Sequence, residues 1–300
     1  MSVLSNNGLM KFNDGERTRY IQSSLTDTSS PVGMNISDNK TAAAEIAQSM
    51  GLLLPPTVPY SDESSFSTFL NEHSLLVIKP TDGSHGNGVT TNVKEISQLK
   101  NAIELAKLAS KSKNIILQKQ ITGHDVRLLI IDGSLAAAAI RTPASIKGDG
   151  KHTIAELIKI ENANYLRGTD YHTSLNVISL KAANDYFGDE INSIIPDEEE
   201  IVQVVGTANI GTGGTASDVT DRIPVAVVDQ AVKLLEELSL NCGGVDFITS
   251  NLEDATEYYF IEVNASPSFG LHLKPTLGSP RQVQKIFVDM LLRKENETGA

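Results

Sequence analysis

Three oxygen-bearing side chains near the end of the chain could hold a metal ion. Glu262 and Asn264 are two residues apart, so in a β-strand they lie on one face. Ile261 and Val263, which alternate with them, then face a core. Asp246, in an upstream β-like run, could supply a further oxygen to the same ion, and oxygen ligands of this kind suit Mg²⁺. The alternative interpretation is two ordinary strands, each with one polar face.

A lysine before a glycine-rich loop could bind phosphate. Lys79 lies near the end of a predicted strand, 75–80, and the loop 83–88 leads into a second β-like run, 89–93. Glycine lets backbone N–H groups converge on an anion, and the lysine adds a positive charge. The P-loop and the dinucleotide-binding motif are both excluded because no helix follows the loop. The segment therefore predicts a glycine-rich hairpin over phosphates, with a plain glycine hairpin as the alternative.

Composition excludes several classes of partner and site. The 300-residue chain has 25 basic and 37 acidic residues, and its formal charge of −12 argues against a nucleic-acid partner. Cys242 is the single cysteine, so a disulfide within the chain and a cysteine-built zinc site are excluded. No apolar run has the length of a membrane span, and the first residues lack the order of a signal peptide. We therefore expect no membrane partner and a cytoplasmic location.

The predicted elements must bring these residues together. Residues 1–37 predict an irregular lead-in with one short strand near 20–22, and Asp38 is the expected cap of the helix that follows. Strands and helices then alternate, with a hairpin around Asp132-Gly133, which indicates an α+β class with about two subdomains. The further segments are helices at 42–50, 61–71, 94–111, 153–163, 225–238 and 281–293, and strands at 114–118, 126–131, 135–141, 201–205 and 244–248.

The order of the motifs resembles the ATP-grasp superfamily of carboxylate–amine ligases. The resemblance is strongest to the ATP-grasp modules of cyanophycin synthetases and of bifunctional bacterial glutathione-synthesis enzymes. It covers about residues 15–280 and depends on several motifs in order. These are Lys40 opening a helix, Lys79-Pro80 with the glycine loop, and the segments 123–127, 141–144, 148–154, 207–214, 245–246 and 262–264.

The resemblance implies an ATP-grasp fold, in which two α+β subdomains grip ATP and the N-terminal α/β domain of such ligases is largely absent. Residues 1–37 would be a short lead-in, and residues 38–120 would be the small subdomain with the glycine-rich loop. Residues 121–300 would be the large subdomain, with the metal site and a lid insertion at about 144–205.

The resemblance also assigns roles to residues. Asp246, Glu262 and Asn264 would hold Mg²⁺, with two ions expected. Lys79, Arg141 and Asn209 would act on the transferred phosphoryl group and the acyl phosphate. ATP would be bound by Lys40, Lys79, Ser84, His85, Gly86, Gly88, the hinge residues Gln118, Lys119 and Ile121, and Asp125.

The implied reaction activates a carboxylate with ATP and joins the acyl group to an amine, releasing ADP and phosphate. The substrates would be small molecules or peptides, and a homodimer or a partner protein could supply the missing domain. A non-catalytic or partner-dependent ATP-binding subunit is the alternative function. Three residues keep two interpretations: Arg127 as a ligand contact or an ion pair with Asp125, His85 as a phosphate contact or a turn cap, and His272 as a substrate contact or an exposed loop residue.

Overall fold

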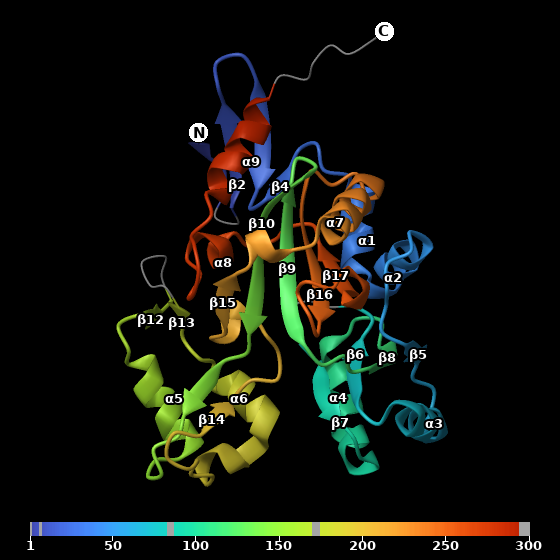
Figure 1. The fold of residues 1–300 in the computed structure, drawn as a ribbon, viewed down its shortest axis with the longest axis vertical. Helices are drawn as coiled ribbons and strands as arrows, with labels where there is room; N and C mark the ends of the chain where they lie inside the picture. The colour runs from blue at the N-terminus through green and yellow to red at the C-terminus, as the bar shows by residue number, and fades with distance from the viewer. Residues whose placement is uncertain (1, 6–7, 83–86, 170–174, 294–300) are drawn as a thin grey trace.

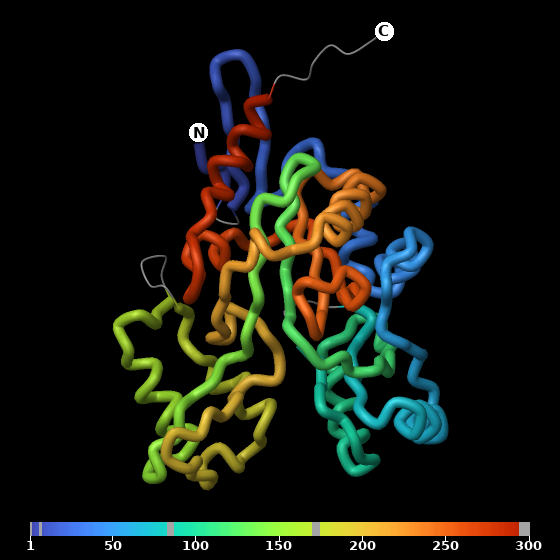
Figure 2. Tube along the Cα trace, in the orientation of Figure 1, coloured from blue at the N-terminus to red at the C-terminus, as the bar shows by residue number. Residues whose placement is uncertain are grey.

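The computed structural model describes residues 2–5, 8–82, 87–169 and 175–293 (Figure 1). Its centre is a large antiparallel sheet, below which a small sheet and an inserted body form two separate lobes. The tube in Figure 2 shows the chain leaving the large sheet for the inserted body and returning to it. Within the described ranges, no helix has the length and apolar character that crossing a membrane requires.

The N-terminal segment is folded, so the expectation of an irregular lead-in is wrong. Strands β1 (Ser2–Val3), β2 (Leu9–Asn13), β3 (Thr18–Gln22) and β4 (Leu25–Thr26) form a sheet in that order. Among the apolar residues of these strands, only Ile21 is fully buried. The alternation of apolar and polar residues was therefore too weak to indicate a sheet.

Two helices, rather than one, follow this sheet. Helix α1 (Pro31–Asp38) ends where the cap was expected, and Asn39 caps α2 (Lys40–Ser49). The Asn39 side-chain oxygen accepts hydrogen bonds from the backbone N–H groups of Thr41 and Ala42, both at 3.1 Å. Asp and Asn cap helices about equally well, so residue type alone does not choose between adjacent positions.

The small sheet has the order β5-β8-β6-β7. Its strands are β5 (Thr57–Pro59), β6 (Leu76–Pro80), β7 (Thr90–Val93) and β8 (Ile115–Lys119). Helices α3 (Glu63–His73) and α4 (Leu99–Ala109), the latter after the short η1 (Ile96–Gln98), complete this body. Phe66, Ile78 and Leu117 belong to its buried core. Because strand side chains alternate, Lys79 and Gln118 lie on the opposite, open face.

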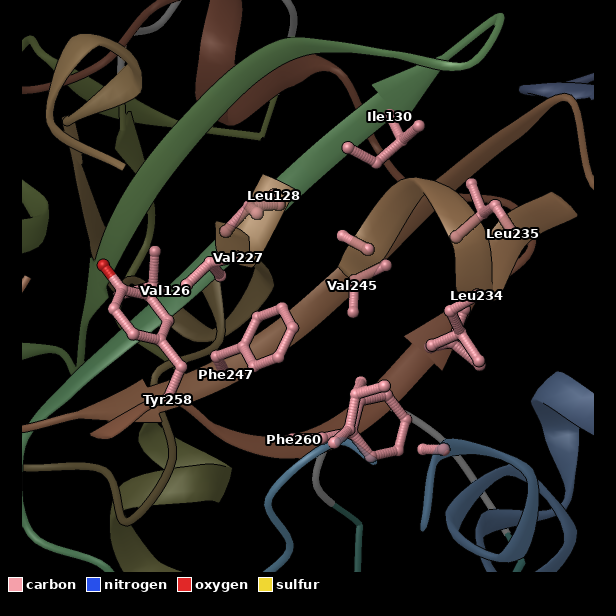
Figure 3. Close-up of a cluster of buried hydrophobic side chains, with 14 of the residues drawn as sticks. Val126, Leu128, Ile130, Val227, Leu234, Leu235, Val245, Phe247, Tyr258 and Phe260 are labelled. Carbon is pink, nitrogen blue, oxygen red and sulfur yellow. The ribbon is translucent and has the colours of Figure 1, made fainter. Parts of the chain in front are cut away.

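The large sheet has the order β15-β10-β9-β16-β17. Its strands are β9 (His124–Ile131), β10 (Ser134–Thr142), β15 (Thr215–Asp218), β16 (Cys242–Thr249) and β17 (Tyr259–Asn264). Helix α7 (Val225–Glu237) covers one face, where Val126, Val245 and Phe247 pack beneath it (Figure 3). Helices α8 (Gly270–Leu273) and α9 (Val283–Leu292) lie on the other side. The predicted hairpin is confirmed, with positive φ at its turn residues Asp132 and Gly133.

The inserted body has its own hydrophobic core, whose residues run from Ala144 to Val205. Its elements are β11 (Ser145–Lys147), α5 (Ile154–Asn162), β12 (Arg167–Gly168), β13 (Leu175–Asn176), α6 (Leu180–Phe187), η2 (Gly188–Asn192) and β14 (Ile201–Gln203). The short helices η3 (Ile210–Thr212), η4 (Thr220–Arg222) and η5 (Ala255–Glu257) lie in later connections. A separate core of this kind allows the body to pack as a unit beside the sheet.

Candidate functional site

A cavity of about 720 Å³ is lined by residues of both sheets. Lys79 and Gln118 reach it from the small sheet, Ile261 from the large sheet, and Lys40 from the first turn of α2. Its volume is in the range that small-molecule and cofactor sites occupy. Lys107 and Lys113 also line it, and four lysines with one carboxylate, Glu45, make a local positive site in an acidic protein, which suits a polyanion such as ATP.

Lys79 is buried in this cavity. Its Nζ donates a hydrogen bond of 2.9 Å to Gln118 Oε1, and Gln118 Nε2 donates to Thr57 Oγ1 at 2.8 Å. Burial lowers the pKa of Lys79 to about 8, an effect that the charge of Glu262 opposes and the charge of Lys40 reinforces. An anion bound beside Lys79 would favour its charged form.

Five strand positions form one row across the large sheet. Asp218 pairs with Ala139, Ala139 with Arg127, Arg127 with Asp246, and Asp246 with Glu262. Residues that pair directly in antiparallel strands share a face, so the charged side chains of this row lie together. The sequence showed the alternation within each strand, but it gave no information on which residues of neighbouring strands are opposite.

Glu262 and Asn264 share a face, as expected, but Ile261 does not face the core. Asn264 Nδ2 lies 3.4 Å from Glu262 Oε1. The pairing jumps from Asp246–Glu262 to Phe247–Phe260, which leaves Ile261 as the extra residue of a β-bulge. The bulge shifts the alternation, so Phe260 enters the core and Ile261 lines the cavity.

Two arginines hold the carboxylate of Asp246, which is fully buried. Arg127 donates from Nε to Oδ1 at 2.7 Å and from Nη2 to Oδ2 at 2.6 Å. Arg141 donates from Nη2 to Oδ2 at 2.8 Å. Burial would raise the pKa of Asp246, but the two guanidinium groups outweigh burial and lower this pKa to about 2.

Asp125 pairs with Arg141 rather than with Arg127, so of the two interpretations of Arg127 the ion pair with Asp125 is wrong. Arg141 Nε donates to Asp125 Oδ1 at 2.7 Å, and these two residues are direct partners across β9 and β10. Arg127 is instead the direct partner of Asp246 across β9 and β16. Asp125 and Arg127 are two residues apart on β9. Arg127 binds Asp246 on the adjacent strand β16, and Arg141 of β10 binds Asp125.

The donor set suits Mg²⁺ if the nucleotide supplies further oxygens. Glu262 keeps 31% of its side chain exposed, and Asn264, whose Nδ2 lies 3.4 Å from Glu262 Oε1, carries an amide oxygen on the same face. Both oxygens of Asp246 already accept hydrogen bonds from arginine. Within the described part of the chain, no group of three or more acidic, histidine or cysteine side chains is arranged to hold a metal. Mg²⁺ is commonly bound by one or two carboxylates plus substrate phosphates, and Glu262 would supply such a carboxylate.

The Gly/Thr segment at 207–214 leads into the strand that pairs with the Arg141 end of β10. Asn209 caps η3, and its Oδ1 accepts a hydrogen bond of 2.8 Å from the Gly211 backbone. The segment then enters β15, in which Ala216 pairs directly with Arg141. A Cβ on Gly213 would lie 2.6 Å from the backbone of Ile178, so this turn packs tightly on the inserted body.

Comparison with known proteins finds ATP-grasp proteins. The family model described as prokaryotic glutathione synthetase, ATP-grasp domain, matches residues 44–164. Cyanophycin synthetase from Synechocystis sp. is 33% identical over 299 residues, which cover 96% of this chain and 34% of that protein. The crystal structure of a bifunctional glutathione synthetase from Pasteurella multocida superposes with a TM-score of 0.62 at 25% identity, covering 95% of this chain and 41% of that chain. The chain has the ATP-grasp fold.

The similarity to other ATP-grasp proteins has the same extent. The glutathione biosynthesis bifunctional protein GshAB of Enterococcus faecalis is 28% identical over 286 residues, which cover 91% of this chain and 38% of that protein. The chain therefore spans between a third and two fifths of the length of these relatives.

The remaining residues expected to bind ATP lie in three different settings. Ser84, His85 and Gly86 lie outside the described residues. Gly88 has a φ of +71°, and a Cβ there would lie 2.6 Å from Ala109 Cβ. The expected hinge residues Lys119 and Ile121 are not in the lining of the cavity, whereas Gln118 is. Their contacts with adenine stay a prediction.

His272 is buried, so the interpretation as an exposed loop residue is wrong. It is 2% exposed, in the short helix α8 that packs against β10 and β15. Neither ring nitrogen has a hydrogen-bond partner among the described residues. Burial lowers the pKa of His272 to about 3, and the charge of Arg127 lowers it further, so the ring is neutral near pH 7.

Some residues that line the cavity of about 720 Å³ were not predicted as part of a site. Leu54 and Thr57 line the cavity beside the buried Lys79. They follow α2, in a segment whose prolines indicated only a helix end. These residues line the cavity because their segment connects the two sheets. The Leu53 carbonyl accepts a hydrogen bond from the Phe260 backbone N–H of the large sheet, and β5 pairs with β8 of the small sheet.

Proposed function

We propose that this chain is the ATP-grasp part of an ATP-dependent ligase that joins a carboxylate to an amine through an acyl phosphate. One observation carries the proposal: Lys40 and Lys79 line one cavity together with Ile261 of the large sheet, the residue next to Glu262 in β17. A phosphate-binding lysine and a metal-binding carboxylate are thus available to one nucleotide. ADP and phosphate are the expected products of a complete turnover.

The residues support the first step by positioning and by charge. The carboxylate oxygen of the acid attacks the γ-phosphorus of ATP, which forms an acyl phosphate and releases ADP. Lys40 and Lys79 would neutralise phosphate charge, and this is the main demand that phosphoryl transfer makes of a protein. Glu262 and Asn264 would hold Mg²⁺, which supplies further charge neutralisation when bound. Two ions would need a second site beside these residues.

The second step forms the amide bond. The amine nitrogen attacks the acyl carbon, the bond to phosphate breaks, and the nitrogen loses a proton. Arg141 would stabilise the developing oxyanion, since it is held in place by Asp125 and Asp246. Asn209 and the adjacent Gly/Thr segment would contact the acyl group on the side where Arg141 lies.

The test is a phosphate-release screen over pools of carboxylates and amines, followed by mass analysis of the product. We expect ADP and phosphate to appear in equal amounts only when both substrates are present. Glu262→Gln should abolish this release, and Glu253→Gln, an exposed residue outside the site, should leave it unchanged. ATP binding without any acid-dependent release would contradict catalysis by this chain and would favour a non-catalytic or partner-dependent subunit.

A further inference from the structure

Arg167 of the inserted body is a buried residue whose hydrogen bonds reach beyond that body. Its side chain is 4% exposed, and its Nε donates to Glu161 Oε1 at 2.8 Å. Its Nη1 donates to two backbone carbonyls, that of Asn176 at 2.8 Å and that of Gly213 at 3.1 Å. Glu161 and Asn176 belong to the inserted body, whereas Gly213 belongs to the Gly/Thr segment. A guanidinium group holds its acceptors in a rigid planar arrangement, so Arg167 fixes the Gly213 carbonyl relative to the inserted body.

Two further hydrogen bonds hold the Gly/Thr segment on the inserted body. Asn176 Nδ2 donates to the Ile210 carbonyl at 3.0 Å. The backbone N–H of Ser179 donates to the Thr212 carbonyl at 3.2 Å. With the bond from Arg167, the carbonyls of three residues of the segment accept hydrogen bonds from the inserted body. The position of the segment therefore depends on the inserted body, and Arg167 supplies the charged donor.

The same segment packs closely on the strand that carries Arg141. A Cβ on Gly214 would lie 2.8 Å from the carbonyl oxygens of both Asn209 and Thr142. Thr142 directly follows Arg141 on β10, and β15 pairs with both residues. The Gly214 backbone N–H also donates to the Asn209 carbonyl at 3.1 Å, so Asn209 moves with the segment. A shift of the segment on the inserted body would therefore displace Asn209 relative to Arg141.

We propose that Arg167 is a positioning residue for amide formation and acts through the Gly/Thr segment. The inference rests on the ligase function proposed above, in which Asn209 and Arg141 contact the acyl group. By fixing the segment, Arg167 keeps these two side chains in place around the acyl phosphate, so that the amine reaches the acyl carbon and water does not. Attack by water would break the bond from the acyl carbon to phosphate and return the free acid, so ATP would be consumed without amide formation.

The role of Arg167 is separable from nucleotide binding. Among the described residues that line the cavity of about 720 Å³, none belongs to the inserted body or to the Gly/Thr segment. The lysines that line this cavity belong to α2 and to the body of the small sheet. Loss of Arg167 should therefore affect the fate of the acyl phosphate and leave the affinity for ATP nearly unchanged.

The experiment compares the wild type with Arg167→Met and Asn176→Ala, using an acid and amine pair that supports phosphate release. The phosphate released per amide formed is measured together with kcat. The wild type should release about one phosphate per amide, and both variants should release at least about twice as much, because water then reaches the acyl phosphate. Their kcat for amide formation should fall by about 10- to 100-fold. The Kd for AMP-PNP with Mn²⁺ should change by less than about threefold, since the nucleotide cavity is separate.

The controls separate the positioning role from folding and from the proposed function. Asn192→Ala is the matched control, because Asn192 also lies in the inserted body but its Nδ2 donates to the Asp189 carbonyl of the same body. This variant should keep the wild-type ratio and kcat. If Arg167→Met does not fold, Asn176→Ala decides alone, since it removes one hydrogen bond and no charge. A wild-type ratio of phosphate to amide in the folded variants overturns the positioning role alone. Absence of ADP release by the wild type with every pair overturns both proposals.

Discussion

Lys79 donates a hydrogen bond of 2.9 Å from Nζ to Gln118 Oε1, which joins the predicted phosphate-binding lysine to the first residue of the predicted hinge. The lysine is 6% exposed, and burial lowers its pKa to about 8. A buried ammonium group with one neutral acceptor is incompletely compensated. A nucleotide phosphate in the cavity would supply the negative charge that the buried ammonium group of Lys79 lacks. The charge state of Lys79 is therefore linked to nucleotide binding.

The affinity for ATP should therefore depend on pH through Lys79. Above pH about 8 the free protein loses the lysine proton, while bound phosphate raises the pKa of Lys79. The Kd for ATP, measured by calorimetry with Mg²⁺ present, should rise by up to about tenfold per pH unit between pH 8 and about 10. The guanidinium group of the Lys79→Arg variant stays charged, so the Kd of this variant should be flat over the same range. Lys107→Arg, at an exposed lysine of the same cavity, should keep the wild-type slope. A flat wild-type profile would contradict the assignment.

Removal of Arg127 should destabilise the fold because Asp246 would stay buried with half of its arginine partners. Arg127→Met should lower the free energy of unfolding by about 3 kcal/mol, measured by urea denaturation. The double variant Arg127→Met with Asp246→Asn should be less destabilised than the sum of its single variants. Strict additivity would show that the two side chains do not interact.

Replacement of His272 should change how stability depends on pH. The unfolded histidine has an ordinary pKa near 6.5 and the folded one a pKa of about 3, so between these values only the unfolded state gains the proton. The wild type should thus lose about 1.4 kcal/mol of unfolding free energy per pH unit as pH falls below about 6. His272→Leu lacks this loss, so its stability relative to the wild type should increase toward pH 4. A constant difference from pH 7 to about 4 would contradict the neutral buried ring.

Two glycines with similar backbone angles should respond differently to alanine. Gly88 and Gly133 have φ of +71° and +69°, and a Cβ would meet Ala109 at 2.6 Å in the first case and nothing within 4 Å in the second. Gly133→Ala should cost about 1 kcal/mol from the left-handed backbone alone. Gly88→Ala should cost about 1–3 kcal/mol more because of overpacking. Thermal unfolding of the two variants measures the difference, and equal losses would contradict the close approach of the loop to α4.

Much of the site could be predicted from the sequence because its residues occur in strands with clear alternation. Glu262 and Asn264 share a face for that reason. Ile261 could not be placed, because its bulge depends on how β17 pairs with β16. The partner of Arg127 depends on the register between β9 and β16, and the sequence of neither strand specifies that register.

The fold was predictable where apolar periodicity is strong, as in α7 and in the hairpin of β9 and β10. It was not predictable in the N-terminal sheet, where Ile21 is the only apolar strand residue that is fully buried. The helix cap at Asn39 was missed by one residue, since Asp38 has the same capping chemistry. His272 could not be placed because its burial comes from packing of α8 against distant strands.

In the proposed function, Glu262 holds the metal that accompanies the nucleotide. The direct measurement is the affinity for Mn²⁺ with the non-hydrolysable analogue AMP-PNP, compared with AMP-PNP alone in EDTA, for the wild type, Glu262→Gln and the surface control Glu253→Gln. Glu262→Gln should weaken binding of the Mn²⁺ complex by about tenfold or more, while binding of metal-free AMP-PNP changes by less than about threefold. The control should match the wild type in both. Binding of the Mn²⁺ complex to Glu262→Gln as tightly as to the wild type would contradict the metal site and the function built on it.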